Sequence, residues 1–163
     1  MISVFIFLAC AHASDNKKLA VFHFQNQGLE TDAAQSIPEN IQGELQKTST
    51  YEFLDGQKIE TIITEQKINR EDCADTCLAR VGKLAGADQV LTGTAILQDG
   101  LYTISARLLD VETGTTVHEI SFDSQDKNEL LQFGLYYLAA GLAGKPLPKK
   151  NGGTKMYTVT LEA

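Results

Sequence analysis

The chain has 163 residues, of which 43% are hydrophobic and 21% charged, and it carries a formal net charge of −7 at pH 7. This composition excludes a disordered or fibrous chain and is typical of one globular domain that is long enough to bury a core. The acidic balance argues against a nucleic-acid surface, because phosphate binding needs clustered Lys and Arg, and the longest basic runs are the pairs Lys17-Lys18 and Lys149-Lys150.

The start of the chain has the pattern of an export signal. An uncharged apolar run, residues 2–8, precedes Ala11-His12-Ala13, which has the small-x-small form of a signal-peptidase site. A buried first strand is the alternative, and lipidation of Cys10 is a second exported form that the sequence leaves open. No other stretch has the ~18 consecutive apolar residues that a membrane span needs, so we expect no transmembrane span in the mature chain. The expected divisions are a signal peptide over residues 1–13, an α/β domain over residues 14–144, and a linker with a terminal strand over residues 145–163.

The first half of the domain alternates strands and helices. KLAVFHF, residues 18–24, is apolar on both faces and predicts a strand buried between two layers. Apolar residues then recur at helical spacing, which predicts a helix with Thr31 or Asp32 as its cap and a kink or restart at Pro38. YEFL, residues 51–54, predicts a second strand. Strand, helix and strand in this order indicate a parallel βαβ unit.

The second half predicts a helix followed by an antiparallel meander. Asp75 is expected to cap a helix that carries Leu78 and Val81 inward, and Gly86 is expected to end it. Three strands follow, over QVLTGTAIL, LYTISARLLDV and TTVHEISF, with Gly-containing connections suited to hairpins. A closing helix is expected from about residue 127 to 143. The predicted fold class is α/β (α+β), with a single mixed sheet, a βαβ first half, an antiparallel meander, and helices packed on the sheet.

Cys73 and Cys77 lie four positions apart, at the start of that predicted helix. If both lay in one helix their Cβ atoms would be ~5–6 Å apart, whereas a disulfide requires ~3.5–4.5 Å, so Cys73 must lie outside the helix for a bond to form. An oxidising compartment favours the bond, and we expect a structural disulfide. Free thiols and a redox or metal site are the alternatives, although thioredoxin-like centres use the closer spacing C-x-x-C.

Other motifs of catalysis or cofactor binding are missing from the sequence. His23, His118 and the scattered carboxylates have no spacing that is typical of a metal site. Gly82-Lys83 fails as a phosphate loop, because Leu84 stands where Ser or Thr should bind magnesium. We therefore expect no cofactor, no metal and no catalytic residue.

Four blocks of the chain resemble one family. They are KLAVFHFQNQGL, ELQKTSTYEFLD, CADTCLARVGKLAGADQVLTGTAI and YTISARLLDVETGTTV. These blocks resemble the bacterial envelope superfamily that includes the curli-secretion protein CsgG, LpoB-type activators of penicillin-binding proteins, and the amino-terminal domain of TolB. The resemblance runs from about Lys18 to Phe122. It implies a parallel-then-antiparallel sheet covered by helices. It also implies a non-catalytic domain in the periplasm or at the outer membrane that works through protein contacts. Such domains often form part of an assembly, and a homo-oligomer is one possible form.

The expected function is that of an exported, non-catalytic protein-interaction or assembly module of the bacterial cell envelope, with one or more envelope proteins as partners. Either an exposed sheet edge accepts a partner strand, or the loop from Ile68 to Cys77 is a recognition element held by the disulfide. Candidate partner contacts are Lys67, Asn69, Arg70 and Glu71. Two alternatives stay open: a thiol-disulfide or other enzyme centred on Cys73 and Cys77, and a small-ligand sensor with a pocket near the ends of the parallel strands.

Overall fold

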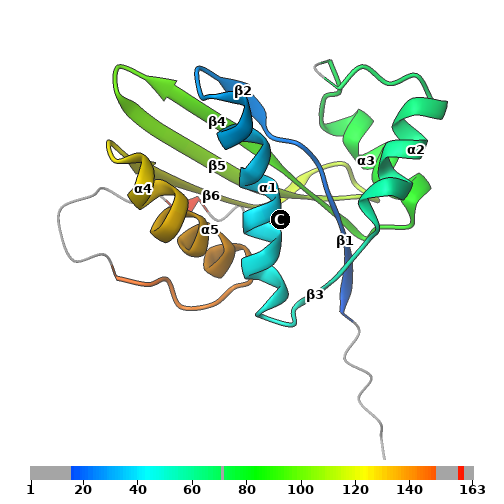
Figure 1. The fold of residues 1–163 in the computed structure, drawn as a ribbon. Coiled ribbons are helices and arrows are strands. Elements are labelled where there is room, and N and C mark those ends of the chain that lie inside the picture. Colours follow the sequence, from blue (N-terminus) through cyan, green and yellow to red (C-terminus); the bar gives the residue numbers. More distant parts are fainter. Residues whose placement is uncertain (1–15, 71, 150–157, 160–163) are drawn as a thin grey trace, which may run out of the picture.

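The computed structural model describes residues 16–70, 72–149 and 158–159, which form one mixed sheet with helices on both of its faces (Figure 1). The strands are β1 (Lys17–Val21), β2 (Gln25–Gln27), β3 (Tyr51–Phe53), β4 (Gln89–Gln98), β5 (Leu101–Asp110), β6 (Thr116–Ser124) and β7 (Thr158–Val159). The helices are α1 (Thr31–Gln46), α2 (Gly56–Glu65) and α3 (Asp75–Ala85), followed by a closing helical run of α4 (Lys127–Glu129), the π-helical turn η1 (Leu130–Gly134) and α5 (Leu135–Leu142). The predicted signal peptide, residues 1–13 with Cys10, lies outside the described residues.

The strand order confirms the predicted fold class. Neighbouring strands follow the order β3-β1-β4-β5-β6-β7, and β2 also pairs with β4. β1 runs parallel to β3 and to β4, as a βαβ unit requires, whereas β4, β5 and β6 pair antiparallel as a meander. The terminal strand β7 pairs antiparallel with β6.

The expected continuous strand over residues 18–24 is wrong. β1 pairs with β4 up to Val21, and pairing with β4 resumes at Gln25 in β2. Three residues lie between Val21 and Gln25, whereas only two lie between their partners on β4, Leu91 and Thr94. The chain between β1 and β2 therefore has one extra residue, as in a β-bulge. The extra residue lets Phe22 and Phe24 pack on opposite faces of the sheet, where a regular strand would have turned both to one face.

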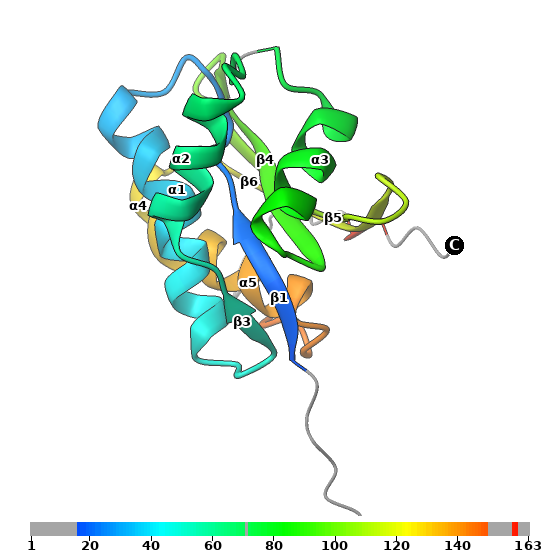
Figure 2. The same cartoon turned by 90° about the vertical axis from the view of Figure 1, so that its right-hand side faces the viewer.

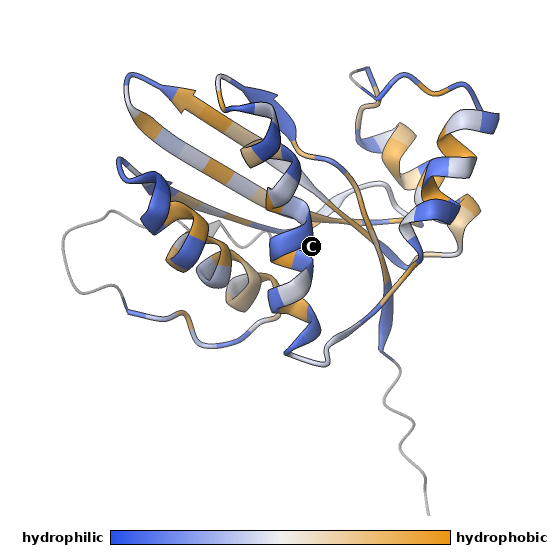
Figure 3. Cartoon of the chain, viewed as in Figure 1, coloured by the Kyte–Doolittle hydropathy of each residue, from blue (hydrophilic) through white to orange (hydrophobic). Residues whose placement is uncertain are grey.

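Each face of the sheet buries its own hydrophobic cluster. Successive strand residues point to opposite faces, and accordingly Leu91 belongs to the cluster under α1 and α5 whereas its neighbour Val90 belongs to the cluster under α2 and α3. Figures 1 and 2 show the two helix layers on either side of the sheet. In Figure 3 the hydrophobic positions gather along the strands and on the helix sides that meet them.

Two expected helix caps are corrected by the structure. The cap position of α1 is Glu30, without a side-chain cap, and α1 runs through Pro38 as one helix without a restart. The cap position of α3 is Ala74, and Asp75 is the first helical residue. Gly86 ends α3 as expected, in the left-handed conformation with φ +83°.

Candidate functional site

The candidate site lies at the carboxyl ends of β1 and β3. After β1 the chain passes to α1 on one face of the sheet, and after β3 it passes to α2 on the other face. Open α/β sheets have a crevice where successive connections leave to opposite faces, and ligands bind there in many proteins of this class. The topology therefore opens a cleft between residues 31–42 of α1 and residues 56–60 of α2.

This α1–α2 cleft has a volume of about 600 Å³. Its apolar surface includes Phe22, Pro38 and Ile59, which come from the strand end, α1 and α2 respectively. Polar lining residues are His23, Asn26, Gln35, Glu39, Gln42, Glu60 and Arg70. A volume in this range, with apolar walls and a few polar groups, is typical of a small-molecule site.

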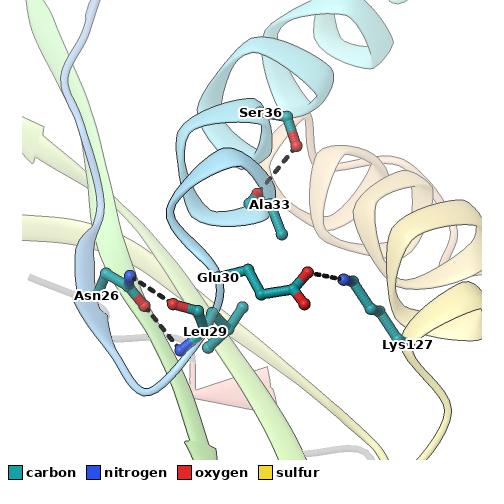
Figure 4. Close-up of polar contacts among 6 residues, drawn as sticks. All are labelled: Asn26, Leu29, Glu30, Ala33, Ser36 and Lys127. Carbon is teal, nitrogen blue, oxygen red and sulfur yellow. Dashed lines mark hydrogen bonds and ion pairs between the residues drawn. The ribbon is translucent and has the colours of Figure 1, made fainter.

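The α1 wall of the cleft is fixed at its first turn (Figure 4). Asn26 donates through Nδ2 to the carbonyl oxygen of Leu29 at 3.0 Å and accepts at Oδ1 from the Leu29 backbone N–H at 3.2 Å. Glu30, at the cap position, forms an ion pair with Lys127 of α4, with 2.5 Å between Oε2 and Nζ. This ion pair lowers the pKa of the Glu30 carboxyl and raises that of the Lys127 ammonium. The start of α1 is thus tied both to β2 and to the closing helices.

His23 occupies the bulge between β1 and β2 and lines the cleft. Its Nδ1 atom is buried and has no hydrogen-bond partner within the described part of the chain. Burial lowers the pKa of the ring, the nearby Arg70 guanidinium lowers it further, and a hydrogen bond to the Arg70 backbone partly opposes both effects. The ring is therefore neutral at pH 7, which leaves one of its nitrogens as an acceptor.

A loop between α2 and α3, residues 66–74, contributes Arg70 to the lining of the cleft. Cys73 in this loop is bonded to Cys77 in the first turns of α3, with a Cα–Cα distance of 5.2 Å. Cys73 lies outside the helix, as the sequence geometry requires, and only 6% of its surface is exposed. It packs in the hydrophobic cluster under α2 and α3, beside Phe22 and Leu78. Because the sulfur is bonded and buried, the geometry favours a structural role over thiol exchange.

The structure places three of the four predicted contact residues on this loop, and Glu71 lies outside the described residues. Lys67 is exposed at the end of α2, with φ +50°. Asn69 donates through Nδ2 to the Asp72 carboxylate at 2.5 Å, within the loop itself. Arg70 forms an ion pair with Glu60 of α2 and lines the cleft. Of these side chains, Lys67 is the one with an exposed charge and no ion pair among the described residues.

The start of α3 is tied to the sheet by an ion pair. Asp75, expected as a helix cap, instead accepts a hydrogen bond at Oδ1 from Nη2 of Arg107 on β5, at 2.6 Å. The loop is therefore held near its middle by the Arg70–Glu60 pair and at its end by the disulfide, next to the Asp75–Arg107 pair.

Sequence reasoning considered His23 only as a metal ligand and did not single out Glu39 or Glu60. Within the described part of the chain, no group of three or more His, Cys, Asp or Glu side chains is arranged to hold a metal ion. The position of the cleft agrees with the pocket that the small-ligand alternative expected near the ends of the parallel strands. Among residues 16–70, 72–149 and 158–159, no helix has both the length and the hydrophobicity needed to cross a bilayer.

Comparisons with known proteins point to one family. A family model described as the peptidoglycan-synthase activator LpoB matches residues 4–120. None of the curated proteins compared with the chain matches it significantly in sequence.

Solved structures share the fold. The LpoB C-terminal domain from Escherichia coli is 16% identical with a TM-score of 0.57, and the match covers 72% of this chain and 88% of that domain. Lipoprotein GNA1162 from Neisseria meningitidis is 14% identical with a TM-score of 0.57, covering 69% of this chain and 83% of that protein. TolB from Acinetobacter baumannii is 14% identical with a TM-score of 0.50, covering 78% of this chain and 28% of TolB.

Proposed function

The chain belongs to the LpoB family of peptidoglycan-synthase activators, and from this premise we propose that it stimulates a peptidoglycan synthase by binding it directly on the periplasmic side of the outer membrane. Proteins of this family act on an enzyme and are not enzymes themselves, in agreement with the expected non-catalytic module of the cell envelope. The observation that carries the proposal is the family match, which spans more than half of the chain and includes the loop and both of its cysteines.

The docking surface in this proposal is the loop from Ile68 to Cys77, together with Lys67 just before it. A surface that is already ordered loses less conformational entropy when it binds, so a fixed loop binds more tightly than a mobile one with the same contacts. The disulfide and the buried Cys73 side chain support this role, because they hold the loop against the hydrophobic cluster under α2 and α3. Lys67 then offers a positive charge to an acidic patch of the synthase, and Asn69 lies next to it on the same exposed loop.

The test is the rate of glycan-chain polymerisation by a purified peptidoglycan synthase from the same bacterium, measured with and without the mature protein. We expect the protein to raise the rate, and the charge reversal Lys67→Glu to weaken both the stimulation and the binding measured in a pull-down. Lys145→Glu is the matched control, because Lys145 is exposed just after α5, at the end of the sheet where β3 begins, and the substitution changes the net charge equally.

The outcomes separate the function from the surface. A wild-type protein that neither binds the synthase nor changes its rate would contradict the proposed function. Normal stimulation by Lys67→Glu, or an equal loss in both variants, would contradict the assignment of the loop while leaving the function in place.

A further inference from the structure

We propose that the α1–α2 cleft is a binding site for small aliphatic amines, that is, molecules with one protonated amino group on an apolar stem. This binding activity differs from docking on a synthase and goes beyond it, although the cleft shares Arg70 with the docking surface described above. The ligand class follows from what the cleft offers: apolar walls, excess negative charge and a buried hydrogen-bond acceptor.

The apolar walls select the stem of the ligand. Phe22, Pro38 and Ile59 reach the cleft from three different segments, so an aliphatic chain that enters it would contact apolar groups on several sides. Phe22 and Ile59 belong to the hydrophobic cluster under α2 and α3, and Pro38 is a buried residue of α1, so all three side chains hold fixed positions. Transfer of methylene groups from water to such a surface is favourable by about 0.8 kcal/mol for each fully buried group.

The charges select a cation. Glu39 of α1 and Glu60 of α2 lie on opposite walls of the cleft. Glu60 is neutralised by its ion pair with Arg70, whereas Glu39 has no ion pair within the described residues. The cleft therefore keeps one uncompensated negative charge, which attracts an ammonium group and repels a carboxylate.

His23 supplies the acceptor. Its buried Nδ1 atom has no hydrogen-bond partner among the described residues, although the residue lines the cleft. Buried polar atoms in folded proteins are nearly always paired, so we assign the unpaired nitrogen of this cleft-lining residue to a ligand N–H. The nitrogen itself is buried, so the ring must turn toward the cleft to accept that hydrogen bond. The charged Arg70 beside the ring disfavours a second positive charge on the imidazole itself, so the ring acts as an acceptor for the N–H of an amine.

The test is a titration of the ¹⁵N-labelled mature protein, followed by ¹H–¹⁵N correlation NMR at pH 7. The probes are n-hexylammonium chloride, hexan-1-ol and sodium hexanoate, which share the six-carbon stem and differ in charge. We expect saturable shifts at the amides of His23, Glu39 and Ile59 with hexylammonium, weaker binding of the alcohol, and no saturable binding of the carboxylate.

Two variants of equal charge show whether the cleft is responsible. Glu39→Gln should weaken hexylammonium binding about fivefold, as expected for the loss of one partly exposed ion pair. Glu65→Gln is the control, because Glu65 is exposed on α2, does not line the cleft, and its replacement changes the net charge equally. A third variant, His23→Phe, keeps a ring in place but removes the acceptor, and it should also weaken binding.

Three results would overturn the inference: no saturable shifts with hexylammonium, equal binding of hexanoate, or an equal loss in Glu39→Gln and Glu65→Gln, which would indicate general attraction to an acidic protein. Stimulation of the synthase by Glu39→Gln should equal that of the wild type. Amine binding is measured by NMR without the synthase, and synthase stimulation is measured without the amine. Either proposal can therefore be contradicted while the other one stands.

Discussion

Removing the disulfide measures how strongly the 66–74 loop is held. In the double variant Cys73→Ala/Cys77→Ala, the bond that closes a ring of five residues is lost. The chain-entropy model assigns about 2 kcal/mol of stability to a ring of that size. For a protein of this length, 1 kcal/mol corresponds to about 2–4 °C in Tm, so we expect the Tm to fall by about 4–8 °C.

Thermal unfolding followed by circular dichroism, with and without dithiothreitol, separates the bond from the packing of its sulfur atoms. The reduced wild type lacks the bond but keeps both sulfur atoms, and its Tm should fall by about the same amount. Because Cys73 is buried, the variant loses apolar contacts as well, and its Tm should lie slightly below that of the reduced wild type. The variant should not respond to dithiothreitol.

Equal Tm values for the oxidised wild type, the reduced wild type and the variant would refute this reasoning. The loop would then be fixed entirely by its other contacts, namely the Arg70–Glu60 ion pair and the half-buried Ile68 side chain. A fall in Tm without any loss of synthase stimulation would keep the stability argument and remove the disulfide from the docking proposal.

Three further predictions concern the core and its titrating groups. Gly93→Ala should destabilise the protein by about 1–3 kcal/mol, because the new Cβ would overlap the carbonyl oxygen of Ser105. Gly43→Ala lies in an open position of α1 and should stabilise the protein by up to about 1 kcal/mol. Urea unfolding measures both changes in the free energy of unfolding. Burial raises the pKa of the Tyr51 hydroxyl, so the neutral form is favoured in the folded state, and the stability difference between wild type and Tyr51→Phe should shrink as pH rises above about 10. Burial and Arg70 lower the pKa of His23 in the folded state. The stability that the neutral ring contributes is therefore present above the unfolded pKa of about 6.5 and is lost as pH falls through the folded pKa. The variant His23→Gln should lose less stability than the wild type between pH 7 and pH 5, and identical stability profiles would contradict the lowered pKa of His23.

Features that depend on residues close in sequence were predictable. The position of Cys73 outside α3 follows from the four-residue spacing of the cysteines, and the end of α3 follows from Gly86, whose left-handed conformation is costly for other residues. The meander was predictable for the same reason, since each hairpin joins neighbouring strands.

Features set by distant residues were not predictable from patterns. The sequence predicts that both faces of the first strand are covered, but it does not reveal that the strand breaks after Val21, which lets Phe22 and Phe24 pack on opposite faces. Asp75 has the composition of a helix cap, but Arg107, 32 positions later, engages its carboxylate instead. A pocket near the ends of the parallel strands was expected, but the residues of α1 and α2 that form its walls were not, because the packing of the whole sheet decides how these helices are placed.

The direction of β1 fixes how the molecule is presented to its surroundings. Lys17 starts this strand and His23 follows its far end, so the two residues are separated along the sheet by about 20 Å, at roughly 3.3 Å per residue. His23 lines the cleft, and Figure 1 shows the connection between α2 and α3 at the same end of β1. A tether attached upstream of Lys17 would therefore join the domain at the Lys17 end of β1. The 66–74 loop would lie at the other end of the domain, where a partner protein could bind it.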